Sequence, residues 1–454
     1  MAYSQSVIDP ELAASSLSAH RFRRLASAWI TLVPSKGITV LVQLVAIPTV
    51  YRGLGPQLFA AYAAVTSAVS IMGFLNLGMG GALVTPFARS VANGDNQEQT
   101  RLLSSTLVPI LIGTGVTLCL SLAVLSTLPL SLLFGVASHA VPPGELRSAA
   151  CVACIGTLIS IPLSVVDNVR QAFQETHISN LFNTISNVVL CAGLLGVARF
   201  HPRLLAFVSV TALSPLAVRL TNLFALHAHH PHLRVIRWRL TSRVQVTALA
   251  TDGLSYLGAS AIASVLLYEW PVYYMSRVRP PVESSGFAVQ LQVVLLLITF
   301  GVSLLQPLWP AIADAVARRD RHWVSTAVIR SRLGSVGYGV LCMFLLGFGM
   351  RWILNTWIHR SIPMTHAGCW LAGIYVLLAM WEYVHWPLAL GIGAMKSASN
   401  LVFLRALAFA FAIPLAVRFG QPGIMLSLCA SILIFSAWSY PLLLSRRLRM
   451  CWSS

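Results

Sequence analysis

The chain has 454 residues, of which 57% are hydrophobic and only 10% carry a charge, and its mean hydropathy is +0.76. Soluble domains carry about 25% charged residues, so this composition excludes a soluble globular protein and a disordered one. The net charge of +18 would suggest nucleic acid as a partner of a soluble protein. In a membrane protein it indicates short basic loops beside anionic lipid headgroups.

Twelve apolar segments long enough to cross a bilayer follow one another along the chain. They span residues 28–50, 58–85, 102–125, 149–169, 178–198, 204–226, 246–268, 286–311, 333–349, 367–390, 400–417 and 423–444. Their near-continuous apolarity is typical of membrane helices. The sequence therefore predicts an all-α integral membrane protein with about 12 transmembrane helices.

The distribution of positive residues predicts the topology. Residues 1–27 form a mostly polar N-terminal tail without the short apolar core and cleavage site of a signal peptide. Of the 31 Lys and Arg residues, 19 lie in segments that would be cytoplasmic and 9 in segments that would be external. This asymmetry predicts a cytoplasmic N-tail and a cytoplasmic C-tail at residues 445–454.

The chain divides into two similar halves. Residues 227–245 are the most basic stretch between spans and predict a cytoplasmic linker between six-helix bundles at residues 28–226 and 246–444. FARSVANGD at 87–95 and IADAVARRD at 312–320 share four of nine residues at an offset of 225, and the same offset places Arg52 on Arg277. Such duplication is typical of transporters.

The histidines and cysteines do not predict a metal site. Four histidines lie in the linker, and Cys151 and Cys154 form a CxxC inside the fourth span. A histidine cluster can bind metal, but a solvated loop is the simpler account, and isolated cysteines at lipid depth behave as small apolar residues. We expect no metal and no cofactor.

Lys36 is the most informative residue of the first span. At 1.5 Å per residue it lies about 12 Å down a helix that starts at Ala28. A charge at that depth costs about 2.5 to 3.5 kcal/mol on insertion scales. Lys36 should therefore face a polar interior rather than lipid, and its ammonium would attract an anion such as phosphate.

Further polar residues fall on matching spans of the two halves. Gln43 lies two turns after Lys36, Asn76 lies in the second span and Asp252 in the seventh. The eighth span carries Gln292, Thr299, Ser303 and Gln306 at spacings that share one helix face. Each could simply bond a neighbouring helix. Together they predict a central cavity between the two bundles.

Five other ionisable residues lie within spans or at their ends. Arg219 either lines the cavity or extends to the membrane surface. Asp167 and Arg170 suggest a structural ion pair. Glu382 and His385, one turn apart, are candidates for carrying a proton, although a satisfied polar pair explains them equally well.

Two stretches resemble a known family. RGLGPQLFAAYAAVTSAVSIMGFLNLGMGGALV at 52–84 is similar to the opening signature of the Wzx-type polysaccharide flippases, in which a GLG-P turn leads into a helix. LLQPLWPAIADAVARRDRHWV at 304–324 resembles the eighth-helix region of the same family. These flippases belong to the multidrug, oligosaccharidyl-lipid and polysaccharide exporter (MOP) superfamily.

The resemblance implies a function. It implies two six-helix bundles around a central cavity, alternating between inward-open and outward-open states. The implied substrate is an undecaprenyl-diphosphate-linked oligosaccharide for O-antigen or exopolysaccharide biosynthesis, flipped across the bacterial inner membrane. The protein would act as a monomer with H⁺ or Na⁺ as a coupling ion, beside membrane lipids and in association with glycan polymerase machinery, with no catalytic residues and no nucleic acid.

The resemblance also suggests roles for the polar residues. Lys36 would attract the diphosphate, and the sugar path would be lined by Gln43, Asn76, Asp252, Gln292, Thr299, Ser303 and Gln306, together with Arg219. Related flippases often have several cavity arginines, whereas here Lys36 is the cation placed firmly at mid-depth.

Three other functions fit the sequence less well. A cation-coupled drug or small-molecule antiporter of the same fold should present carboxylates to its cavity, and deep acids are few here. A glycan polymerase or ligase generally needs a large external loop, and the longest predicted one, residues 126–148, is short. A lipid-binding scaffold would tolerate loss of Lys36. We therefore expect a transporter rather than an enzyme.

Overall fold

The computed structural model describes residues 10–72, 78–234, 241–254, 259–306, 308–359, 362–392 and 394–453, and in the first helix it describes side chains from Gly37 onward. All regular elements among these residues are helical. Nine of the helices found there are long and apolar enough to cross a membrane. The prediction of an all-α multi-pass membrane protein is confirmed.

Every span predicted in the first half contains described helix. The elements are α1 (Pro10–Ile71), α2 (Met79–Ala92), α3 (Asn96–Thr127), α4 (Leu130–Phe134), η2 (Gly135–Ala140), α5 (Pro143–Leu163), α6 (Val165–Ala172), α7 (Thr176–Phe200), α8 (Leu204–His229) and η3 (Pro231–Arg234). Helix α1 starts 18 residues before the predicted first span, inside the predicted N-terminal tail.

The second half is helical in the same way. Its elements are α9 (Arg243–Gly253), α10 (Ala259–Ser264), η6 (Val265–Glu269), α11 (Trp270–Val278), α12 (Pro281–Leu305), α13 (Leu308–Ala317), α14 (Arg321–Ile358), α15 (His366–Tyr383), α16 (His385–Gly391), α17 (Met395–Ala416), η7 (Val417–Phe419), α18 (Gly420–Ser431), η8 (Ile432–Ser436) and α19 (Ser439–Ser453). Both η6 and η8 are π-helical turns.

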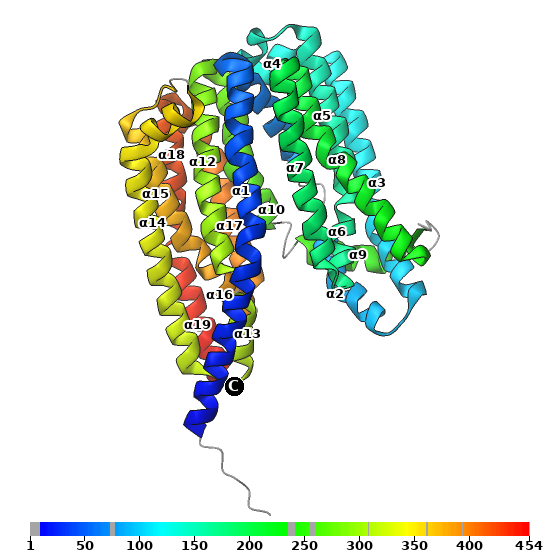
Figure 1. Cartoon of the computed structure of the whole chain (residues 1–454), viewed down its shortest axis with the longest axis vertical. Helices are drawn as coiled ribbons and strands as arrows, with labels where there is room; N and C mark the ends of the chain where they lie inside the picture. The colour runs from blue at the N-terminus through cyan, green and yellow to red at the C-terminus, as the bar shows by residue number, and fades with distance from the viewer. Residues whose placement is uncertain are drawn as a thin grey trace, which may run out of the picture.

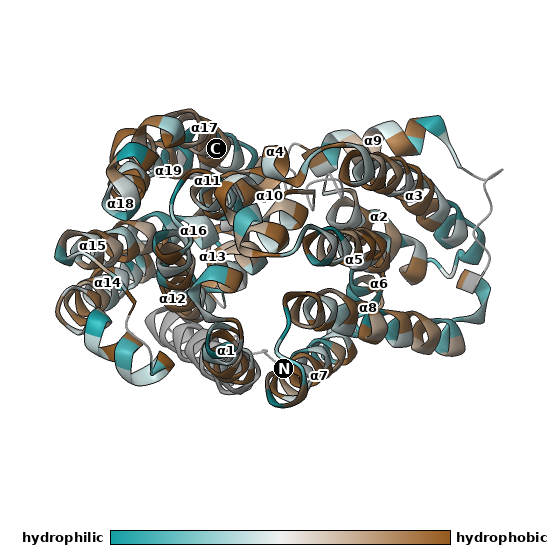
Figure 2. Cartoon of the chain, turned by 90° about the horizontal axis from the view of Figure 1, so that it is seen from above, coloured by the Kyte–Doolittle hydropathy of each residue, from teal (hydrophilic) through white to brown (hydrophobic). Residues whose placement is uncertain are grey.

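The helices form two bundles that meet at one end of the molecule. Figure 1 shows α3, α5, α7 and α8 in one bundle and α12, α14, α15 and α18 in the other. The bundles approach each other around α4 and the bend of α1, which we call the closed end, and diverge toward α2, α9, α13 and α19, the open end. Apolar residues predominate along the bundle helices seen from above (Figure 2), as lipid contact requires.

The first two predicted spans are joined by a sharp bend at the closed end. Gly55 has φ 71° and ψ 172°, inside the range assigned to α1. A positive φ of this kind favours glycine, and Pro56 next in sequence disfavours helical backbone at the residue before it. The Gly-Leu-Gly-Pro sequence therefore turns the chain back on itself.

A left-handed glycine precedes α2. Gly78 has φ 70° at the N-terminal end of that helix. The predicted second span is therefore not one continuous helix, because the backbone turns at Gly78. Broken helices are tolerated at membrane depth where protein or a cavity surrounds the exposed backbone groups.

The turn after α2 recurs after α13 with the same geometry. The Asp95 carboxylate accepts a hydrogen bond from the Glu98 backbone N–H at 2.9 Å, and Asp320 accepts one from Trp323 at 3.0 Å. The preceding residues, Gly94 and Arg319, have φ 69° and 58°. Every position is offset by 225 residues, as the internal duplication predicts, and each aspartate caps the next helix.

Arg52 links the bend of α1 to the second bundle. Its Nε donates to the Ile358 carbonyl at 2.7 Å, and one terminal nitrogen bonds the Trp357 carbonyl and lies 2.6 Å from His359 Nδ1. The Trp357 indole donates in return to the Leu44 carbonyl of α1 at 2.7 Å. The guanidinium lies at the last carbonyls of α14, where a positive charge also interacts favourably with the helix dipole.

A second link joins the two halves at the closed end, and here residues of the second half contact the first. The Tyr273 hydroxyl of α11 donates to the Leu133 carbonyl of α4 at 2.6 Å. Gly135 has φ 54°, and a Cβ added there would lie 2.1 Å from the Arg277 carbonyl oxygen. Arg52 and Arg277, aligned by the repeat, therefore each contact the loop after a long helix of the other half.

Arg52→Ala is expected to loosen the closed end, because it removes charge-assisted bonds that join the halves. Spin labels at Leu132 and Trp352, both exposed, would report this as a larger fraction of long distances. Arg351→Ala is the control, since Arg351 bonds the Met364 carbonyl within the second bundle. An unchanged distance distribution in Arg52→Ala would mean that Arg52 does not hold the closed end.

Candidate functional site

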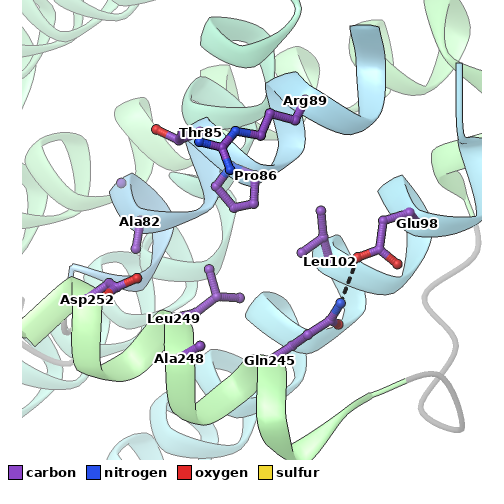
Figure 3. A pocket seen from close by; sticks show the side chains of 11 residues that line it. Ala82, Thr85, Pro86, Arg89, Glu98, Leu102, Gln245, Ala248, Leu249 and Asp252 are labelled. Atoms are coloured by element: carbon purple, nitrogen blue, oxygen red, sulfur yellow. Dashed lines mark hydrogen bonds between the residues drawn. The ribbon is translucent and has the colours of Figure 1, made fainter. Parts of the chain in front are cut away.

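A pocket of about 700 Å³ lies near the open end between α2, α3 and α9. It is lined by Gly81, Ala82, Thr85, Pro86, Arg89, Glu98, Leu102, Gln245, Ala248, Leu249 and Asp252. Figure 3 shows Thr85 and Arg89 projecting from α2, and Asp252 and Gln245 from α9. Binding pockets typically measure about 300 to 1,000 Å³, so this one could hold a group of one or two sugar rings.

Groups of both signs line the pocket. Arg89 is exposed, and its guanidinium makes no hydrogen bond or ion pair with another described residue. Thr85 lies one turn before it on the same face of α2, while Asp252 lies on the α9 wall. Glu98 is partly compensated by Arg101 at 3.8 Å. Neither charge dominates, so the lining offers donors from α2 and acceptors from α9.

Polar contacts hold α9 against the first bundle, although it belongs to the second half of the sequence. Gln245 Nε2 donates to Glu98 Oε1 at 2.7 Å, a bond drawn in Figure 3. Ser105 Oγ donates to Gln245 Oε1 at 3.1 Å and accepts from the Ser242 backbone N–H at 3.2 Å. The pocket is therefore built from both halves of the chain.

The predicted site residues are distributed unevenly around this pocket. Asp252 lines it. Lys36 lies within α1, but its side chain is outside the described part, and Asn76 lies outside the described residues altogether. Gln43 is exposed on α1.

The polar stripe of α12 does not share one environment. Thr299 and Gln306 are exposed, and Gln306 follows the end of the helix. Ser303 is buried and donates to the Thr299 carbonyl at 2.7 Å. Gln292 is half-buried, and its Oε1 has no hydrogen-bond partner among the described residues. Only part of the stripe is thus available to a ligand in this conformation.

No family model and no curated protein matches this sequence. Solved structures do. An inward-facing multidrug resistance MATE family transporter of the MOP superfamily superposes with a TM-score of 0.73 at 14% identity, covering 90% of this chain and 96% of the other. The chain has the fold of the MOP-superfamily transporters.

Two other structures with the MOP fold superpose less closely. An outward-facing MATE family transporter gives a TM-score of 0.65 at 14% identity, with 95% of this chain and 96% of that chain covered. A MOP superfamily transporter from Pyrococcus furiosus, described as having a binding pocket of reversed polarity, gives 0.64 at 14% identity over 95% and 96%. The fold is shared almost end to end.

Arg219 lies inside the first bundle of the MOP fold. Its Nη1 donates to the Ser160 carbonyl of α5 at 3.0 Å, and the residue is half-buried. It is not among the residues that line the pocket.

Asp167 and Arg170 are joined through Asn222 rather than directly. Arg170 Nε donates to Asn222 Oδ1 at 2.7 Å, and Asn222 Nδ2 donates to Asp167 Oδ1 at 3.2 Å. The Arg170 ion pair goes instead to Glu175 Oε2 at 2.7 Å. The direct pair expected from sequence is therefore replaced by a network that ties α6 to α8.

Glu382 and His385 have separate partners. The Glu382 carboxylate pairs with the Arg405 guanidinium of α17. His385 Nδ1 lies 2.7 Å from the Trp381 carbonyl, and its Nε2 has no partner among the described residues. The two predicted proton carriers are not hydrogen-bonded to each other in any contact of the described chain.

The start of the linker is held to the first bundle by histidines. His230 Nε2 lies 3.0 Å from Glu175 Oε1, and its ring stacks on Phe173 at 3.9 Å between centroids. His232 Nε2 lies 2.7 Å from Gln99 Oε1. These imidazoles make structural contacts, and no group of three or more metal ligands occurs in the part of the chain that is described.

The linker contacts shift two pKa values. Burial raises the pKa of Glu175, but the hydrogen bond and charge of His230, followed by those of Arg170, outweigh burial and hold it below its usual value. Burial, and next the charge of His230, lower the pKa of His232. At neutral pH, Glu175 is therefore ionised and His232 neutral.

The folded protein is expected to lose stability as pH falls from 7.5 to 5.5, in part through His232. Its pKa is lower when folded, so protonation favours the unfolded chain once the pH passes the ordinary histidine value of about 6.5. The Glu175 contribution is lost only at lower pH, below the ordinary carboxyl value of about 4.3. His232→Gln should reduce the fall in melting temperature, whereas His322→Gln, at an exposed position, should not. Equal falls in melting temperature in wild type and both variants would exclude a contribution from His232.

Two residues with potential functional roles are not among those the sequence predicts. Arg89 lies in the aligned block FARSVANGD, which falls mostly between two predicted spans. Arg405 lies inside the predicted span 400–417, yet nothing in its spacing places it opposite Glu382. The signal available was the rarity of arginine at that depth.

Proposed function

We propose that this protein flips a lipid-linked oligosaccharide, carried on undecaprenyl diphosphate, across the bacterial cytoplasmic membrane by alternating access. The pocket at the open end carries the proposal. Its lining includes the Arg89 guanidinium and the Thr85 hydroxyl from α2, and the Asp252 carboxylate and the Gln245 amide from α9. Balanced donors and acceptors suit a hydroxyl-rich head group better than a purely cationic ligand.

A protein of two bundles suits the physical requirements of flipping a polar head group. A diphosphate and several sugars cannot cross hydrocarbon unaided, because each buried charge or unpaired polar group costs several kcal/mol, about 2 to 7 for a neutral one. The polyprenyl tail can stay in the bilayer while the head group passes between bundles. We assign Lys36 to the diphosphate and Gln43, Asn76, Asp252, Gln292, Thr299, Ser303, Gln306 and Arg219 to the sugar path.

The observed conformation fits the inward-open state of the proposed transport cycle. We assign the open end to the cytoplasm, with both termini on that side, and the closed end to the periplasm. The better superposition on an inward-facing transporter, 0.73 against 0.65 for an outward-facing one, favours this assignment. A monomer near glycan polymerase machinery, coupled to H⁺ or Na⁺, completes the proposal.

A cation-coupled drug antiporter is the second candidate. Two observations favour it: solved proteins of this fold include multidrug resistance transporters, and Asp252 and Glu98 line the pocket. Arg89 opposes it, since a guanidinium that no described residue pairs repels a cationic drug.

The deciding experiment measures lipid-linked oligosaccharide in cells that lack the gene. A membrane-impermeant sugar probe applied to intact and everted vesicles reports which leaflet holds the glycan. Accumulation on the cytoplasmic face, reversed by the wild-type gene, is expected. An unchanged glycan pool together with altered resistance to cationic compounds would favour the antiporter.

A further inference from the structure

Two charges face each other in the interior of the second bundle. Arg405 of α17 and Glu382 of α15 form an ion pair with only 3% and 5% of their side chains exposed. Both residues lie within helices that could span the membrane. The pair is remote in sequence from the pocket residues, and neither member lines the pocket.

A carboxylate at this depth needs a compensating charge or a proton. Burying an unpaired ion costs several kcal/mol after relaxation, so an isolated Glu382 would bind a proton or a metal cation. A guanidinium is protonated at every physiological pH and cannot dissociate from the chain. Arg405 therefore gives Glu382 a permanent positive partner, whereas an exchangeable cation would compensate its charge only while bound.

The groups around the pair are mostly hydroxyls. The Tyr268 hydroxyl of η6 lies 3.1 Å from the Tyr383 hydroxyl. The Tyr375 hydroxyl donates to the Tyr268 hydroxyl at 3.4 Å. Tyr375, Tyr440 of α19 and Cys429 of α18 lie within electrostatic reach of Arg405. These neighbours are neutral at physiological pH, so the charge on Glu382 is balanced chiefly by Arg405.

Backbone irregularity accompanies the pair. Tyr268 lies in the π-helical turn η6, and the second π-helical turn, η8, packs against α15 and α17. Such turns occur frequently at functional sites. Arg405 Nε is buried and has no hydrogen-bond partner among the described residues. A guanidinium left partly unsatisfied in a dry interior is costly, which argues for a role beyond packing.

We infer that Arg405 is an internal counter-ion that holds the position a coupling cation would need at Glu382. The transport cycle then takes up and releases neither H⁺ nor Na⁺ at this carboxylate, and coupling, where it exists, uses another group. This inference rests on the proposed role as a transporter but not on the identity of the substrate. Glu382 then has a positioning role and does not transfer a proton.

The test measures cation binding to the purified full-length protein with ²²Na⁺, together with proton uptake in unbuffered solution. Wild type and Glu382→Gln should give the same signals. Arg405→Gln should acquire Na⁺ binding at least about tenfold tighter than wild type, or a new proton, because Glu382 loses its counter-ion. Arg332→Gln is the control: this guanidinium lies over Trp381, 5.7 Å from the ring centroid, in the same bundle.

Wild-type Na⁺ binding or proton uptake that disappears in Glu382→Gln would overturn the inference. So would an Arg405→Gln protein that folds and acquires neither ligand. If Arg405→Gln does not fold, Glu382→Gln/Arg405→Gln removes both charges and is expected to fold and to keep translocation within about threefold of wild type. Loss of a gradient response in that double variant would restore Glu382 as the carrier. The Na⁺-binding and proton-uptake readouts need no glycan, so they remain valid if the flippase proposal fails.

Discussion

Lys36→Ala is expected to lower the rate of glycan translocation at least about tenfold, a loss of about 1.4 kcal/mol of binding or transition-state stabilisation. A compact ammonium attracts phosphate as a point charge, and its attraction is stronger in a cavity of low dielectric than in water. Removing it leaves the diphosphate without its proposed partner. The initial rate of head-group transfer in vesicles, normalised to inserted protein, measures this change.

The chain provides a matched control for Lys36. Its only other lysine is Lys396, which is exposed near the start of α17. Lys396→Ala should translocate like wild type, and Lys36→Arg should keep part of the activity because it keeps the charge. A normal rate for Lys36→Ala at matched protein level would remove Lys36 from the binding site.

Much of the fold could be predicted because apolar length alone identifies a membrane helix. The described residues of all twelve predicted segments lie almost entirely in helices. The turn at Gly78 could not be predicted, since a broken helix is as apolar as a continuous one. Whether the backbone stays helical there depends on neighbouring helices that can satisfy its free N–H and C=O groups.

The site was only partly predictable for a related reason. Helical spacing gives the face of a helix on which a residue lies, but not what that face contacts. It predicted a single stripe on α12, and yet Ser303 is buried while Thr299 and Gln306 are exposed. Asp252 was recognised because a carboxylate within a span is rare. Its neighbour across the pocket, Arg89, becomes a candidate only when α9 is seen against α2.

Arg170→Met is expected to lower the free energy of unfolding by about 3 to 5 kcal/mol, the range found when one member of a buried ion pair is removed. Arg170 is fully buried and donates to Asn222 Oδ1 and Glu175 Oε2, both at 2.7 Å. Methionine fills a similar volume but leaves the Asn222 and Glu175 acceptors without their donor. Thermal unfolding of the detergent-solubilised protein, followed by intrinsic fluorescence, measures the loss.

The control separates burial from charge. Arg199→Met removes an exposed arginine from the end of α7 and should leave the melting temperature unchanged. Arg170→Met/Glu175→Gln should recover part of the loss, because it also removes the carboxylate that has lost its arginine partner. A melting temperature of Arg170→Met equal to wild type would contradict the network. Arg170 is not among the residues that line the pocket. The translocation rate of Arg170→Met should therefore fall only as folded protein is lost, whereas the rate of Lys36→Ala should fall while the protein remains folded.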